Sequence, residues 1–156
     1  MTQVFIGIGS SLNKLESIKA GIASLQLEFG KLKQSLIYES ESVGFVGGNF
    51  YNLVIELNTN LPIDRLIRKL KEIEIKHGRV NNAKKFAPRT LDLDLLLYGQ
   101  EVDKKNNLPR AEITKNAFVL KPLSELAPQL THPILNETYQ NLWENYPKDK
   151  QKLWKI

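Results

Sequence analysis

The stretch Pro88-Arg89-Thr90-Leu91-Asp92-Leu93-Asp94-Leu95-Leu96-Leu97-Tyr98-Gly99 predicts a β-strand around which the rest of the chain is organised. In an extended strand, residues i and i+2 point to the same face with Cα atoms about 7 Å apart. Asp92 and Asp94 are therefore expected to point together. The opposite face is expected to carry the alternating leucines: Leu91, Leu93, Leu95 and Leu97. Since Leu96 and Tyr98 follow on the carboxylate face, the far half of the strand is expected to be buried on both sides.

Paired carboxylates at the entrance of a buried strand have the geometry to bind a cation. A half-buried strand with a solvated outer face is the alternative, but polar residues would then continue along the even positions. Asp92 and Asp94 cannot saturate a hard cation, and Mg²⁺ usually completes its octahedron with waters and substrate phosphate oxygens. The missing ligands are therefore expected to come from a substrate.

Length and composition bound the class of protein. A chain of 156 residues with 42% hydrophobic content predicts a single domain over residues 1–156. No apolar run approaches a membrane span and the chain opens without a basic leader, so we expect a cytoplasmic protein. The absence of cysteine excludes disulfides and thiolate metal sites. The net charge of +5 suits an anionic partner, which could be nucleic acid, a phosphorylated small molecule or a membrane surface.

The first half of the chain alternates strand and helix patterns. Residues 4–9 predict a strand, and Asn13 with Glu16 predicts a capping box for a helix that Gly30 ends. The predicted buried face of this helix carries Leu15, Ile18, Ile22 and Leu25. Residues 33–42 predict the next strand.

A third strand is predicted over residues 51–58. The glycine-rich connection before it, residues 43–50, is either a loop that closes on a ligand or a long hairpin loop. A second helix is predicted between Pro62 and Gly78, with a buried stripe of Ile63, Leu66, Ile67, Leu70 and Ile73. Glu74 borders that stripe, either as a solvated partner of Lys71 or as a polar group pointing into a site.

A basic connection leads directly from the second helix into the Asp92–Asp94 strand. Residues 79–89 carry four cations, including Arg79, Lys85 and Arg89. Basic residues next to a carboxylate pair can bind a polyphosphate whose metal ion the carboxylates hold. The combination indicates phosphoryl or pyrophosphoryl transfer, in which positioning and charge neutralisation supply most of the catalysis.

The C-terminal third contains weaker patterns. A short helix is predicted over residues 123–126, because Pro122 and Pro128 are expected to bound it. The tail, residues 132–156, holds both tryptophans and is expected to pack against the domain.

Residues 88–99 resemble the signature of the 6-hydroxymethyl-7,8-dihydropterin pyrophosphokinases, which transfer the β,γ-pyrophosphate of ATP to a pterin hydroxymethyl group in folate biosynthesis. Further matches follow in family order: Ile8-Gly9-Ser10, Phe50-Tyr51-Asn52, Ile73-Glu74, Gly78-Arg79-Val80, Ala117-Phe118-Val119-Leu120 and Pro122-Leu123. The resemblance implies an α+β ferredoxin-like fold, a mainly antiparallel sheet with helices packed on it. It also implies ATP as co-substrate, AMP as the nucleotide product, and two Mg²⁺ ions held by Asp92 and Asp94.

The resemblance also implies roles for individual residues. The pterin would lie between Phe50 and Phe118, with Asn52 on its edge and Val43 and Gly44 lining the pocket. The residues implied to contact ATP are Glu74, Arg79, Lys85, Phe86, Arg89, Leu95 and Arg110, of which Arg79 and Arg89 are also implied in catalysis. Phe86 stands where the family usually has tryptophan.

The chain departs from the family at Arg110, which replaces a common histidine, and at Asn116, which replaces an arginine. Arg110 or Lys115 is hypothesised to supply the cation that Asn116 lacks. These departures leave open a paralogue that acts on a related pterin, or one with weak activity.

Other functions compete with the pyrophosphokinase hypothesis. A basic ferredoxin-like module could bind nucleic acid, although two aspartates on the candidate strand would repel phosphates in the absence of a metal. A kinase that transfers only the γ-phosphate would release ADP rather than AMP. We therefore expect ATP and a pterin as the ligands of a monomer that binds neither nucleic acid nor membranes.

Overall fold

The computed structural model describes residues 1–41, 49–78 and 91–156. Its strands are β1 (Thr2–Ser10), β2 (Lys33–Gln34), β3 (Tyr38–Ser40), β4 (Phe50–Thr59), β5 (Asp92–Tyr98) and β6 (Leu153–Lys155). The helices are α1 (Lys14–Phe29), α2 (Ile63–Lys76), α3 (Glu112–Lys115), α4 (Ala117–Leu126) and α5 (Tyr139–Glu144), with 3₁₀ turns η1 (Lys104–Asn106) and η2 (Lys148–Lys150).

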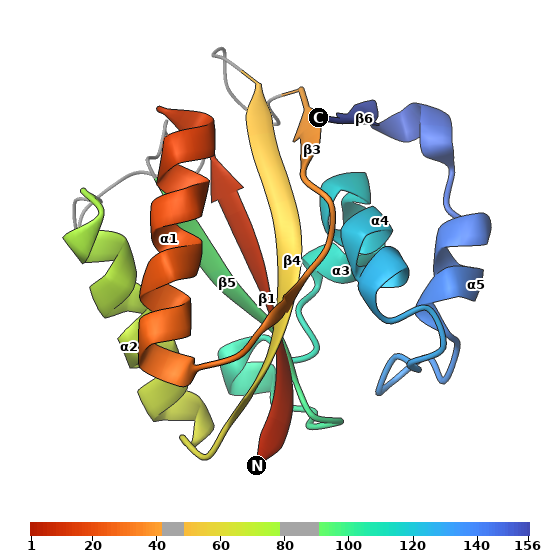
Figure 1. Cartoon of the computed structure of the whole chain (residues 1–156). Helices are drawn as coiled ribbons and strands as arrows, with labels where there is room; N and C mark the ends of the chain where they lie inside the picture. Colours follow the sequence, from red (N-terminus) through yellow and green to blue (C-terminus); the bar gives the residue numbers. More distant parts are fainter. Residues whose placement is uncertain (42–48, 79–90) are drawn as a thin grey trace.

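The strands form one sheet in the order β5-β1-β4-β3-β6, with β2 also paired to β4, and the pairs between these strands are antiparallel. Helices α1 and α2 cover one face of the sheet, whereas α3, α4 and α5 lie on the other side (Figure 1). This arrangement confirms the predicted α+β fold, a mainly antiparallel sheet with packed helices.

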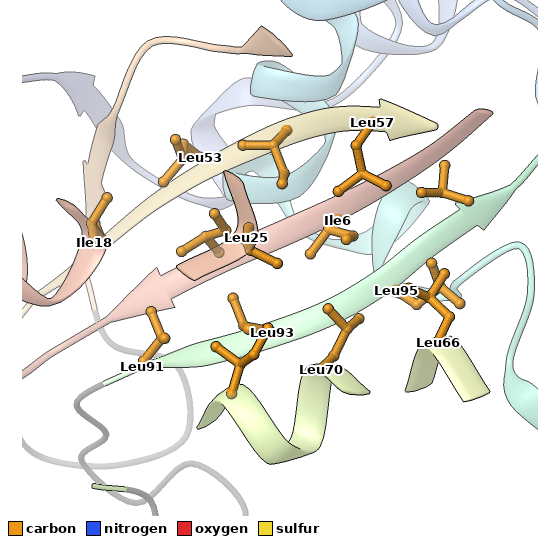
Figure 2. Close-up of a cluster of buried hydrophobic side chains, with 14 of the residues drawn as sticks. Ile6, Ile18, Leu25, Leu53, Leu57, Leu66, Leu70, Leu91, Leu93 and Leu95 are labelled. Carbon is orange, nitrogen blue, oxygen red and sulfur yellow. The ribbon is translucent and has the colours of Figure 1, made fainter. Parts of the chain in front are cut away.

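Each face of the sheet carries its own hydrophobic core. Ile6 of β1 and Ile55 of β4 face α1 and α2, while Phe5 and Val54 face α4. Figure 2 shows the first core, in which Leu93 of β5 lies among leucines and isoleucines of both helices. Burying an aliphatic side chain of this size stabilises the fold by about 1.5–3 kcal/mol. The two cores therefore hold the sheet as a rigid layer between two sets of helices.

Strand β5 contains a β-bulge that the sequence pattern did not predict. Leu95 pairs with Ile6 and Leu97 pairs with Phe5, so Leu96 is an extra residue with no partner on β1. A bulge of this kind places two residues opposite one and changes which face the following side chains occupy.

The bulge corrects two predicted orientations. Leu97 lies beside Leu96 in the second core, on the carboxylate side of the sheet, and not with the other alternating leucines. Tyr98 packs instead against the first core, where its hydroxyl donates a 2.6 Å hydrogen bond to the carbonyl of Leu61. The prediction that the far half of β5 is buried on both sides is nevertheless confirmed.

Helix α1 begins and packs differently from the prediction. Asn13 has a left-handed conformation (φ 45°) and its side chain makes no capping hydrogen bond, so the predicted capping box is wrong. Leu15 is 41% exposed and lies outside the buried face. Gly21 lies on that face instead, where a β-carbon would come within 2.8 Å of Leu91. The glycine therefore lets α1 pack closely against the start of β5. Gly30 ends the helix as predicted.

The strand predicted over residues 33–42 is broken into β2 and β3. The interruption at residues 35–37 has polar partners: Ser35 Oγ accepts from the Val54 amide at 3.0 Å, and the Leu36 amide donates to Glu125 at 2.9 Å. Because Glu125 belongs to α4, a contact distant in sequence fixes this break.

The predicted short helix at residues 123–126 is also wrong, because Pro122 lies inside α4 and not before it. An internal proline costs a helix about 3 kcal/mol. Burial of Val119, Leu120 and Leu123 in the second core offsets this cost. The expected packing of the tail is confirmed, since Tyr139 and Tyr146 are buried and β6 pairs with β3. In the described parts of the chain, none of the helices has the length and apolar character needed to cross a membrane.

Candidate active site

A cavity of about 190 Å³ opens on the face of the sheet that is turned toward α4. It brings together six of the predicted site residues: Phe50, Asn52, Asp92, Asp94, Arg110 and Phe118. These residues come from β4, β5, α4 and the segment before α3, so the pocket forms only when the whole second face of the sheet is assembled.

The residues paired with the two aspartates on the neighbouring strand β1 are both glycines. Asp92 pairs with Gly9 and Asp94 with Gly7 on β1, and both glycines line the cavity. A β-carbon at Gly9 would lie 2.8 Å from the Asn52 amide nitrogen, so only glycine leaves room for the observed position of Asn52. The glycines therefore keep open the space between the carboxylates and the polar group on β4.

The electrostatics of the pocket favour a cation. Burial, followed by the charge of Asp92, raises the pKa of the Asp94 carboxyl to about 7, while the nearby Arg110 opposes the rise. Two neighbouring carboxylates that disfavour each other's charge gain from a bound cation. Within residues 1–41, 49–78 and 91–156, no cluster of three or more His, Cys, Asp or Glu side chains suitable for a metal occurs. A metal at Asp92 and Asp94 would thus depend on ligands from elsewhere, as the donor chemistry of Mg²⁺ allows.

Glu74 supports the carboxylate strand from the opposite side. It is 4% exposed, and its Oε2 accepts a 2.6 Å hydrogen bond from the backbone amide of Leu93, the residue between the two aspartates. The alternative of a solvated partner for Lys71 is therefore wrong. β5 is an edge strand of the sheet, and the carboxylate of Glu74 in α2 accepts the hydrogen bond of one of its backbone amides.

Replacing Glu74 with alanine is expected to destabilise the protein by about 1–3 kcal/mol, because the buried amide of Leu93 would lose its acceptor. Glu74→Gln keeps an acceptor oxygen and should recover most of this loss. Urea unfolding of the three proteins measures the effect. Equal stability of Glu74→Ala and the native protein would contradict this account.

The aromatic part of the pocket comes from two distant elements. Phe50 begins β4 and Phe118 lies in the first turn of α4, and both line the cavity with Asn52. Two aromatic rings that line one pocket suit a flat heterocycle, because aromatic rings stack on such a ligand. Asn52 can then address the polar edge of such a ring, while Ser40 Oγ lies 3.4 Å from its Oδ1.

Gln151 was not predicted, and it connects the C-terminal segment to this wall. Its Oε1 accepts a 2.7 Å hydrogen bond from the Ala117 amide, and its Nε2 donates at 3.0 Å to Asn116 Oδ1. Ala117 is the first residue of α4, whose early amides lack partners within the helix. Gln151 therefore fixes the start of the helix that carries Phe118. No local sequence signal could have indicated a contact across more than thirty residues.

Gln151→Ala is expected to cost about 1 kcal/mol of stability, comparable to the loss of a helix cap. Because Phe118 would become less well positioned, the KM for a ligand that stacks on Phe118 should rise more than the KM for a ligand held by the aspartates. Steady-state kinetics with each substrate varied separately would measure this difference. Gln129→Ala, which removes a surface glutamine from another segment, is the matched control.

Some predicted site residues do not join the cavity. The side chain of Leu95 lies in the first core, on the opposite face of the sheet, whereas Leu96 lines the pocket. Lys115 is exposed, while Arg110 lies with its guanidinium beside Asp94. The remaining predicted residues lie outside the described part of the chain: Val43, Gly44, Arg79, Lys85, Phe86 and Arg89. Glu112 lines the pocket beside Arg110 and was not predicted.

The chain is similar in sequence to a known protein family and to individual members of it. Residues 5–128 match the model of the family described as 7,8-dihydro-6-hydroxymethylpterin-pyrophosphokinase (HPPK). The chain is 36% identical over 140 residues to 2-amino-4-hydroxy-6-hydroxymethyldihydropteridine pyrophosphokinase of Aquifex aeolicus, covering 86% of each chain. It is 37% identical over 141 residues to the protein of the same name from Pseudomonas aeruginosa, covering 84% of each.

Longer proteins contain a similar region. The chain is 34% identical to the folic acid synthesis protein fol1 of Pneumocystis carinii, covering 90% of this chain but 20% of that one. Among solved structures, it superimposes on Plasmodium falciparum HPPK-DHPS with a TM-score of 0.70 at 15% identity, covering 94% of this chain and 44% of that one. At this identity the structural likeness shows the fold, and the chain spans less than half of that solved chain.

Proposed function

Since the chain belongs to the 7,8-dihydro-6-hydroxymethylpterin-pyrophosphokinase family, we propose that its pocket transfers the β,γ-pyrophosphate of ATP to the hydroxymethyl group of 6-hydroxymethyl-7,8-dihydropterin. Family membership makes the protein an ATP-dependent pyrophosphokinase of folate biosynthesis. The observation that carries the proposal is the meeting of Asp92, Asp94, Phe50 and Phe118 in one cavity. The two aspartates suit a metal-bound phosphate, and the two phenylalanines suit a flat ring.

The aromatic residues of the pocket would bind and orient the pterin. Phe50 and Phe118 would hold the ring between them, and Asn52 would hydrogen-bond its edge. With the ring fixed at these three points, its hydroxymethyl group would be directed toward the two aspartates. Leu96 and Val54 line the same cavity and would exclude water from the region between the two substrates.

Asp92 and Asp94 would hold two Mg²⁺ ions, with the substrate phosphates completing the coordination. The donor set fits, because both residues offer hard oxygen ligands and repel each other without a cation. Magnesium bound there would neutralise charge on the transferred phosphates. In this proposal the aspartates act as ligands and not as a general acid and base. Outside the described residues, Arg79 and Arg89 would act in catalysis with Lys85 and Phe86 at the nucleotide, and Val43 and Gly44 would line the pterin pocket.

The decisive experiment identifies the nucleotide product. The protein is incubated with Mg-ATP and 6-hydroxymethyl-7,8-dihydropterin, and the products are separated by anion-exchange chromatography. AMP together with the pterin diphosphate is the expected result. ADP would indicate transfer of the γ-phosphate alone, and no nucleotide product at saturating substrate would contradict the proposal.

The nucleic-acid alternative has its own test. Tight binding of single-stranded RNA in the presence of EDTA would favour a nucleic-acid module over the enzyme, because Asp92 and Asp94 repel phosphates without a metal. A monomeric state, a cytoplasmic location and the absence of nucleic-acid or membrane partners remain predictions.

A further inference from the structure

Arg110 lines the pocket and lies between two carboxylates, those of Asp94 and Glu112. Its Nη2 is 3.3 Å from Asp94 Oδ1, and its Nε is 3.2 Å from Glu112 Oε2. The backbone of Arg110 is anchored independently, because its amide donates a 3.0 Å hydrogen bond to the carbonyl of Leu96 in the β-bulge. A fixed backbone with a long side chain leaves the guanidinium able to change partners while its base stays in place.

The contact between Arg110 and Glu112 is held by charge and not by an aligned hydrogen bond. Both Arg110 Nε and Glu112 Oε2 are buried, and neither makes a hydrogen bond with the described residues. Buried polar atoms without hydrogen bonds are costly. The hydrogen bonding of the guanidinium is therefore incomplete, and an acceptor that entered the pocket beside Arg110 could supply a hydrogen bond that the described residues do not.

The guanidinium contacts the same Asp94 oxygen that would bind a metal ion. While Arg110 contacts Asp94, the Asp94 oxygen already has a cationic partner. A metal ion that binds this oxygen has to compete with Arg110. A guanidinium released from Asp94 would remain next to the incoming phosphates, for which its planar set of donors is well suited.

We propose that Arg110 neutralises Asp94 in the nucleotide-free protein and transfers to a substrate phosphate when the metal–nucleotide complex binds, and that Glu112 is the positioning residue that tethers Arg110. The proposal rests on the proposed function for the identity of the ligand. Arg110, held by Glu112, would then control the order of binding. A divalent cation alone binds weakly because Arg110 competes with it, whereas the cation–nucleotide complex binds well because Arg110 contacts its phosphate.

The test compares two affinities that should change in opposite directions. Mn²⁺ binding to the nucleotide-free protein is measured by electron paramagnetic resonance. Binding of the magnesium complex of an ATP analogue with a methylene bridge between the α- and β-phosphorus is measured by calorimetry. In Arg110→Gln, Mn²⁺ should bind about tenfold more tightly and the nucleotide about tenfold more weakly, since one charge-assisted contact is removed in each case. Lys115→Gln removes the same charge from an exposed neighbouring residue and should change either affinity by much less.

Both affinities falling together, or an Mn²⁺ affinity that changes no more than in Lys115→Gln, would overturn the proposal. Circular dichroism of each variant verifies that the fold is intact. Neither measurement requires turnover. Opposite shifts in a protein that forms no AMP would thus support the role of Arg110 while contradicting the proposed reaction.

The tether is tested by a double-mutant cycle. Glu112→Gln should weaken Mn²⁺ binding, because Asp94 becomes the one carboxylate left to Arg110 among its described ion-pair partners. In the Arg110→Gln background the same change should have a smaller effect, because there is no guanidinium to hold. Equal shifts in both backgrounds would mean that Glu112 acts on the metal through its own charge, which overturns its role as a tether.

Discussion

Replacing Asp94 with asparagine is expected to lower kcat by on the order of 10²–10³-fold, the size of effect seen when a preorganised electrostatic contact to the reacting group is lost. Asparagine has nearly the same shape as aspartate but lacks the charge that would hold a metal ion. Asp92→Asn is expected to have an effect of the same order. Turnover measured at saturating Mg-ATP and pterin tests both variants.

The same variants should fold at least as well as the native protein without metal. The charge of Asp94 is disfavoured by burial and by Asp92, so its removal relieves repulsion in the folded state. Thermal unfolding in EDTA should give an equal or higher Tm. Asp64→Asn removes an exposed carboxylate at the start of α2 and serves as the control, with activity close to native. Activity within threefold of native for Asp94→Asn would disprove the metal-binding role.

Adding a single methyl group at Gly9 is the second substitution for which we expect a large effect. The new β-carbon would lie 2.8 Å from the Asn52 amide nitrogen, a distance that forces the amide to move. Since this amide is the end of a side chain, Gly9→Ala should fold normally but lose the proposed contact of Asn52 with the pterin. The pterin KM is expected to rise about 10–100-fold, which corresponds to the loss of a buried hydrogen bond.

This explanation requires that Gly9 acts through Asn52. Asn52→Ala should raise the pterin KM by a similar factor, and the double variant should be no worse than either single one. Gly7→Ala adds the same methyl group one position along on this face, at 3.5 Å from Leu96 and away from Asn52, and should have a smaller effect. Additive effects of Gly9→Ala and Asn52→Ala would show that the two residues act separately.

Features with a local cause were predicted from the sequence. Strand β4 and helix α2 follow from alternating and helical hydrophobic patterns, and Gly30 ends α1 with a positive φ (82°) that glycine adopts readily. Asp92 and Asp94 line the same pocket because residues two apart along a strand point to the same face.

Features that depend on distant contacts were not predicted. Packing in the second core places Pro122 inside a helix, although local propensity argues against it. The hydrogen bonds of Gln151 to the start of α4 join residues far apart in the chain. The contact of Arg110 with Asp94 could not be predicted, because it depends on how the segment after β5 folds back onto that strand.

Because of the β-bulge at Leu96, the orientation of the side chains of β5 depends more on the number of residues in the strand than on which aliphatic residues they are. Before the bulge the even positions face the pocket, and after it they face the first core, so one unpaired residue reverses the alternation within a single strand. Exchanging one aliphatic residue for another at Leu96 or Leu97 preserves this reversal. Deleting one residue there would move Tyr98 away from Leu61 or rotate the carboxylates out of the pocket. The spacing between Asp94 and Tyr98 is therefore under a stricter constraint than the identity of the three leucines between them.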